Sequence, residues 1–140
     1  MNLKHRLIIM NFLQFAVWGT YLTSMSRYLG PAGMGEHIGL FYSVQGLVSI
    51  FMPTLFGILA DRYVPAQRML ALCHLIAAIS MIGVGMIGSQ STFDFWEIFP
   101  LYTLSVAAYM PTLALSNSVS YNALEKYNLD TVKDFPPIRI

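Results

Sequence analysis

Long uncharged stretches alternate with short charged segments along this chain. Four stretches, at positions 7–26, 38–60, 69–93 and 98–124, contain 20 to 27 residues each and no Asp, Glu, Lys or Arg. A helix rises about 1.5 Å per residue and the bilayer hydrocarbon core is about 30 Å thick, so about 20 apolar residues cross it. The pattern predicts an all-α membrane protein with four transmembrane helices, at about 7–28, 38–60, 69–90 and 97–124.

A fifth helix is expected to begin near the end of the sequence. Positions 134–140 spell Asp-Phe-Pro-Pro-Ile-Arg-Ile, in which the prolines suit the first turn of a helix. Because this helix start has no helix after it, we interpret the chain as the front portion of a longer polytopic protein.

Composition supports a membrane protein and offers no sign of an enzyme. Hydrophobic residues make up 56% and charged residues 11%, whereas soluble domains carry about 25% charged residues. The net charge of +1 does not indicate a nucleic-acid partner, and the single cysteine, Cys73, excludes an internal disulfide framework. The sequence contains no paired catalytic carboxylates, metal-ligand spacing or glycine-rich phosphate loop, so no cofactor or metal is predicted.

The basic residues fall mainly on one side of the predicted membrane. With the N-terminus inside, six lysines and arginines lie in inner segments, whereas Arg27 alone lies in an outer loop. Cytoplasmic loops carry an excess of Lys and Arg, so we predict a cytoplasmic N-terminus and outer loops at about 27–37 and 89–97. The inner basic residues are Lys4, Arg6, Arg62, Arg68, Lys126 and Lys133.

Two predicted helices carry a stripe of polar and aromatic side chains. At 100° per residue, the stripes contain Asn11, Gln14, Trp18, Tyr21 and Met25 in the first helix, and Ser105, Tyr109, Thr112, Ser116 and Ser120 in the fourth. Such stripes face protein or water rather than lipid. Hydrogen bonds between helices would explain the hydroxyl groups. Gln14 beside Trp18 also suits a cavity for a flat heteroaromatic solute, because an amide there adjoins a stacking surface.

Titratable groups are scarce inside the predicted spans. His74 lies one turn into the third span, where it would either relay protons or complete hydrogen bonds near the interface. None of the four stretches contains Asp or Glu. Proton-coupled membrane proteins usually carry an acid in the membrane, so a coupling acid, if there is one, is expected beyond residue 140.

The segment after the second predicted span resembles a transporter signature. Its sequence Gly-Ile-Leu-Ala-Asp-Arg, at 57–62, is similar to the G-x-x-x-D-R/K motif of the major facilitator superfamily. An Asp at a helix end can pair with an Arg and accept hydrogen bonds from a helix N-terminus, and so latch two helix bundles. Asp61, Arg62 and Arg68 are therefore candidate gating residues, with a solvated loop pair as the alternative. The motif is incomplete, since Gln67 occupies a position that is often basic.

Further segments resemble one branch of that superfamily, the nucleoside:proton symporters. The most similar are Phe-Leu-Gln-Phe-Ala-Val-Trp-Gly at 12–19, Tyr-Met-Pro-Thr at 109–112 and the segment at 134–140. The resemblance implies a twelve-helix inner-membrane transporter with two six-helix halves, in which residues 1–140 form the N-terminal part of the first half. It also implies proton-driven nucleoside import, which we do not expect the 140 residues to perform alone.

The same resemblance implies substrate-binding residues. The arginine of the Asp-Phe-Pro-Pro-Ile-Arg segment reaches the substrate cavity in that family, and Arg139 matches it; from the residues alone, an interfacial anchor is an equal alternative. Gln14, Asn117, Tyr121 and Arg139 would supply hydrogen bonds to a nucleoside, and Trp18 would stack its base. The expected partners are a nucleoside, protons, the lipid bilayer and the remaining helices of the transporter. The alternative functions are a facilitator for sugars or organic anions, and a small four-helix membrane scaffold.

Overall fold

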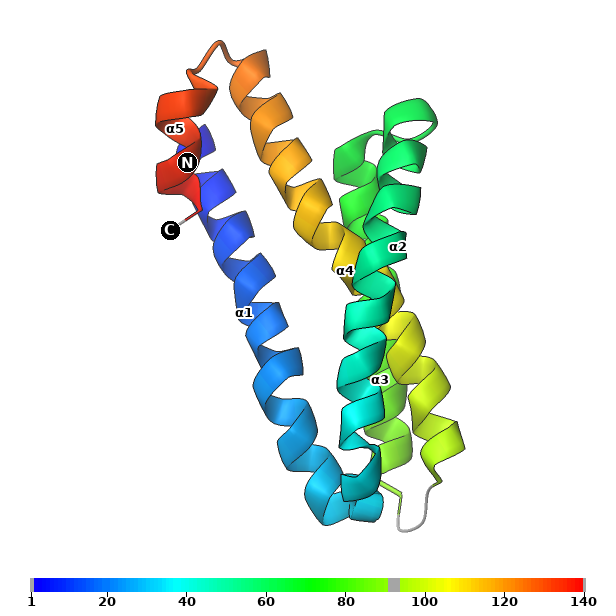
Figure 1. Cartoon of the computed structure of the whole chain (residues 1–140). Helices are drawn as coiled ribbons and strands as arrows, with labels where there is room; N and C mark the ends of the chain where they lie inside the picture. Colours follow the sequence, from blue (N-terminus) through cyan, green and yellow to red (C-terminus); the bar gives the residue numbers. More distant parts are fainter. Residues whose placement is uncertain (1, 91–93, 140) are drawn as a thin grey trace.

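The described residues form five α-helices in succession, with short connections (Figure 1). The computed structural model describes residues 2–90 and 94–139. The helices are α1 Leu3–Leu29, α2 Ile38–Arg62, α3 Ala66–Gly88, α4 Phe95–Lys126 and α5 Thr131–Ile138. The four long helices run alternately up and down, and the short α5 turns back beside the beginning of α1 (Figure 1). Four helices of the described chain are long and apolar enough to cross a membrane, so the predicted all-α membrane fold is confirmed.

The fifth helix begins three residues earlier than position 134. The Asp130 side chain accepts a hydrogen bond from the backbone N–H of Val132 at 2.9 Å, which caps the helix and sets its start at Thr131. Pro136 and Pro137 lie inside the helix rather than at its start. Neither proline has an N–H group, so neither donates a backbone hydrogen bond within the helix. Positions 91–93 of the predicted outer loop and position 140 lie outside the described residues.

A compact turn joins α1 to α2. It consists of one π-helical turn, Gly30–Met34, and one 3-10 turn, Gly35–His37. Gly33 has φ of +82°, in the left-handed region that glycine adopts without steric cost. The turn returns the chain into the bundle with no extended loop.

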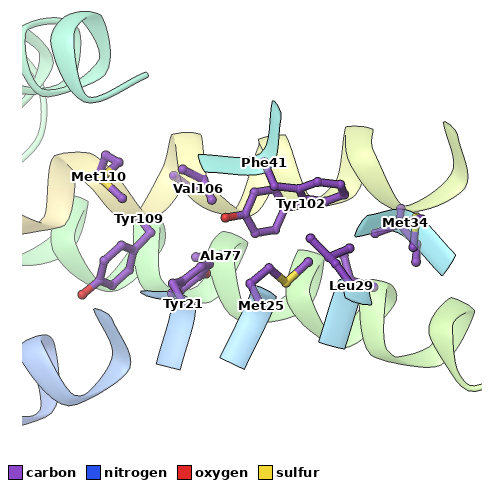
Figure 2. Close-up of a cluster of buried hydrophobic side chains, with 13 residues drawn as sticks. Tyr21, Met25, Leu29, Met34, Phe41, Ala77, Tyr102, Val106, Tyr109 and Met110 are labelled. Atoms are coloured by element: carbon purple, nitrogen blue, oxygen red, sulfur yellow. The ribbon is translucent and has the colours of Figure 1, made fainter. Parts of the chain in front are cut away.

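The main apolar core lies where α1 ends and α4 begins. Figure 2 shows side chains from all four long helices meeting there, including the rings of Tyr21, Phe41 and Tyr102. The Phe41 and Tyr102 ring centres are 4.8 Å apart, and both side chains are fully buried. Outward-facing side chains such as Phe12, Ile50 and Met86 are instead more than 60% exposed, as expected for a surface that faces lipid.

Candidate functional site

Gln14 lies at the centre of a buried hydrogen-bond network that joins α1 to α3 and α4. Its Nε2 donates to the hydroxyl of Tyr109 at 3.1 Å and to that of Thr112 at 2.7 Å. The Tyr109 hydroxyl donates to the backbone carbonyl of Gln14, and the Thr112 hydroxyl donates to that of Tyr109. Since both hydroxyl hydrogens are thus committed, both oxygens must accept from the amide. The orientation of the Gln14 amide is therefore determined by its neighbours.

The orientation of Gln14 also determines the tautomer of His74. The Gln14 Oε1 atom lies 2.8 Å from Nε2 of His74. Because Oε1 can only accept, Nε2 must carry a hydrogen and donate it. His74 thus completes a hydrogen-bond network, one of the two roles expected from the sequence.

The two polar stripes face each other along α1 and α4. Asn11 Nδ2 donates to the Ser120 hydroxyl at 3.2 Å, and the Tyr21 and Ser105 hydroxyl oxygens are 2.5 Å apart. These side chains are buried. The hydroxyl groups of α4 therefore hold α1 through hydrogen bonds, as membrane helices commonly do.

A second group of residues forms a row of rings around one arginine. The Cζ atom of Arg139 lies 5.4 Å from the ring centre of Phe15 and 5.9 Å from that of Phe135, within cation–π distance of both. On one side Phe15 contacts Trp18, with ring centres 6.2 Å apart. On the other side Phe135 stacks on Tyr121, with centres 4.1 Å apart and planes 19° apart. We call these five residues, which come from α1, α4 and the end of α5, the arginine–aromatic row.

The docking of α5 positions Arg139. Lys4 Nζ lies 2.5 Å from Asp134 Oδ1 and ties α5 to the start of α1. Ile138 is 1% exposed and packs in a small apolar cluster with Leu7 and Leu124. With Ile138 buried between α1 and α4, the next residue, Arg139, emerges beside Phe15.

The predicted substrate-binding residues separate into two environments. Trp18, Tyr121 and Arg139 share the arginine–aromatic row, whereas the Gln14 amide is 2% exposed and fully engaged in its network. Asn117 is half-buried on α4, one turn before Tyr121, and no hydrogen bond links its side chain to another described residue.

Sequence reasoning missed Phe15 and Phe135. Phe15 lies three residues before Trp18, and Phe135 four residues before Arg139. Side chains at these spacings are neighbours on a helix. Helical spacing therefore places each ring beside a residue already singled out, but it does not show that both rings meet Arg139.

A cavity of about 760 Å³ lies at the end of the bundle where α2 ends and α3 begins. Tyr121 of the row lines it, together with the candidate gating residue Asp61 and with Lys126. Asp61, Arg62 and Arg68 are exposed. The ion pair found among the described residues joins Lys4 and Asp134, so Asp61 is not paired with either arginine within residues 2–90 and 94–139.

A second cavity, of about 680 Å³, lies along the second half of α1. It is formed between α1 and α3, and His74, Tyr21 and Tyr109 line it.

Three side-chain polar atoms of the described residues are enclosed without a partner: Asn11 Oδ1, Trp18 Nε1 and the Tyr28 hydroxyl. All three belong to α1, the helix that both the network and the row share.

The known proteins to which this chain is similar in sequence are transporters. The chain is 40% identical over its whole length to the nucleoside permease NupG of Escherichia coli and 39% identical to the xanthosine permease of the same organism. It spans about a third of the length of these relatives, 33% in each case. The crystal structure of the nucleoside transporter NupG superimposes with a TM-score of 0.88 at 40% identity, over 99% of this chain and 34% of that one.

The family assignment covers every residue. The nucleoside H+ symporter family matches residues 1–140. This family consists of transporters and not of enzymes. The chain therefore belongs to the nucleoside H+ symporter family of the major facilitator superfamily.

Proposed function

We propose that this chain serves proton-coupled nucleoside import, as the N-terminal part of the first six-helix half of a twelve-helix transporter. We place the transporter in the inner membrane with its N-terminus in the cytoplasm. In this orientation the basic residues at the ends of α2 and α4 lie inside. The relatives named for nucleoside and xanthosine transport support the choice of substrate class.

The observation that carries the proposal is that the guanidinium group of Arg139 has no acidic partner among the described residues. Its guanidinium group contacts two aromatic rings, and no carboxylate among the described residues is paired with it. The N–H donors of the group are therefore free for a ligand that offers several acceptors, as the hydroxyls and base of a nucleoside do. Trp18 lies at the end of the row, with its indole N–H enclosed and without a hydrogen-bond partner among the described residues, and its ring is the candidate stacking surface.

The other predicted residues take supporting places in this proposal. Asn117 has an amide without a partner in the described chain and lies one turn from Tyr121, so it is a second candidate for direct contact. Gln14 acts behind the row by holding α1 against α3 and α4. Asp61, Arg62 and Arg68 remain candidate gating residues, and Asp61 lines the cavity that Tyr121 also lines.

The test uses a chimera in which this chain replaces the matching segment of the E. coli nucleoside permease NupG. Arg139→Ala should weaken uridine binding by roughly 10- to 150-fold, because a charge-assisted hydrogen bond is worth about 1.5–3 kcal/mol. Arg139→Lys should be nearly as poor, because lysine lacks the planar fork. Arg27→Ala is the matched control, since Arg27 is exposed near the other end of α1. Equal affinity in wild type and Arg139→Ala, at equal membrane expression, would exclude Arg139 from the site.

A facilitator for organic anions is the second candidate, and the unpaired charge of Arg139 is the observation in its favour. The two candidates differ in what competes for the site. If the substrate is a nucleoside, unlabelled adenosine or uridine should displace bound uridine and lactate or citrate should not. Displacement by the anions alone would favour the second candidate.

A further inference from the structure

The guanidinium group of Arg139 is held by rings where an acidic partner would ordinarily be found. Arg139 follows the last residue of α5, and its side chain is exposed. A long, exposed arginine samples many rotamers and loses considerable side-chain entropy when it is fixed. Here Phe15 and Phe135, from two different helices, both lie within 6 Å of its charge.

Holding a guanidinium with rings differs chemically from holding it with a carboxylate. A carboxylate would bind the N–H groups directly, usually two at once. A ring attracts the cation through its π face and needs no N–H donor. Rings therefore restrict the position of the arginine and leave its hydrogen-bonding capacity for another molecule.

Each of the two rings that contact Arg139 also contacts a second aromatic ring. Phe135 is stacked on Tyr121 of α4 at 4.1 Å, and Phe15 contacts Trp18 of α1 at 6.2 Å. The row thus connects α4, α5 and α1 through two pairs of ring contacts that the Arg139 guanidinium joins. In the transporter, a change in the distance between α1 and α5 would pull Phe15 away from Arg139.

We propose that Phe15 is a positioning residue, which holds the Arg139 guanidinium in place so that its N–H donors face the nucleoside. This inference rests on the proposed function, because it presupposes that Arg139 binds the substrate. Phe135 has the same effect from the α5 side, but Phe135 also packs against the apolar cluster of Ile138 that docks α5, so Phe15 is the clearer test.

The first experiment measures uridine affinity in the NupG chimera described above. Phe15→Leu removes the ring and keeps an apolar side chain of similar size, and should weaken affinity about three- to tenfold, as expected for losing a cation–π contact. Phe15→Tyr and Phe15→Trp keep a ring and should return affinity to within about twofold of wild type. The matched control is Phe12→Leu, because Phe12 lies one turn earlier on α1, is 66% exposed and makes no ring contact with Arg139.

A double-mutant cycle shows whether Phe15 acts through Arg139. In an Arg139→Ala background, Phe15→Leu should cause no further loss, because no guanidinium remains to be held. An equal loss in both backgrounds, or no loss in wild type, would overturn the inference while Arg139→Ala alone still supports the proposed function. If Arg139→Ala has no effect, the proposed site fails and the positioning role fails with it.

A second measurement needs no transport. In the 140-residue chain in lipid nanodiscs, the ring currents of Phe15 and Phe135 should shift the Arg139 side-chain proton resonances in NMR spectra. Phe15→Leu should reduce this shift, and Phe12→Leu should leave it unchanged. An unchanged Arg139 spectrum in Phe15→Leu would show that the ring does not hold the guanidinium.

Discussion

The Tyr28 side chain occupies the space that any side chain at position 88 would need. A Cβ atom on Gly88 would lie 1.7 Å from the Tyr28 hydroxyl oxygen and 2.9 Å from its ring carbon Cζ. The absence of a side chain on α3 thus allows the end of α1 to approach it. Gly88 lies within the helix α3. It is therefore required for the close approach of Tyr28 and not for an unusual backbone conformation.

Replacement of Gly88 by alanine should destabilise the bundle. Overpacking costs about 1–3 kcal/mol, because Tyr28 must leave its position or α1 must move away from α3. Gly85→Ala is the control, since nothing lies within 4 Å of a Cβ built there, and it should have a neutral or slightly stabilising effect. Thermal unfolding in nanodiscs, followed by circular dichroism, measures both variants. Equal stability of the two would contradict the packing described for Tyr28.

His74 provides a second prediction, because its role in the network is to donate one hydrogen bond to Gln14. His74→Leu should destabilise the fold by about 1–3 kcal/mol by leaving the buried Gln14 oxygen without a partner. His74→Gln, whose amide also has N–H donors, should recover part of that loss. Nitrogen-15 NMR of the imidazole should show the tautomer protonated at Nε2. A ring protonated at Nδ1 alone would refute the deduced direction of the bond.

The attachment of α5 should depend more on apolar burial than on its ion pair. The Lys4 and Asp134 side chains are 43% and 20% exposed, so Asp134→Asn should cost no more than about 1 kcal/mol. Ile138 is almost fully buried, and Ile138→Ala should cost about 2–5 kcal/mol. Hydrogen exchange of the α5 amides measures both effects. Faster exchange in Asp134→Asn than in Ile138→Ala would reverse this ranking.

Membrane orientation can be tested at the connection between α2 and α3. A cysteine at the exposed position Gln67, in a Cys73→Ser background, should resist a membrane-impermeant thiol reagent in intact cells and react after lysis. Cys73 is fully buried, so the background substitution removes a poorly accessible thiol. Prompt labelling in intact cells would place this connection outside and contradict the predicted cytoplasmic N-terminus.

The hydrophobic pattern was sufficient to predict the long helices because a membrane span has a minimum length and little tolerance for charge. The start of α5 was less predictable. Pro136 and Pro137 favoured a start at position 134, but the Asp130 side chain caps the helix earlier. Two local signals thus compete for the start of α5: the cap from the Asp130 side chain and the preference of proline for the first helical turn. The sequence pattern alone did not show which of the two determines the start.

The candidate site was predicted in part. The polar stripe on α1 was recognised as inward-facing, but its members have two roles that the helical period cannot separate. Gln14 turns toward Tyr109 and Thr112, whereas Trp18 lies beside Phe15. Phe15 and Phe135 were overlooked because a phenylalanine in a membrane helix is chemically indistinct until its neighbours are known. Only the docking of α5 reveals that both rings meet one arginine.

The hydrogen bonds between α1 and α4 restrict how these helices can move. Ser105, Tyr109, Thr112, Ser116 and Ser120 recur about once per helical turn along α4. A partial slide of α1 would therefore break its bonds to Ser105, Thr112 and Ser120 together, without offering new hydroxyl partners. The next register that restores such partners is one turn away, about 5.4 Å. Sliding of α1 along α4 would thus occur in discrete steps, in the manner of a ratchet.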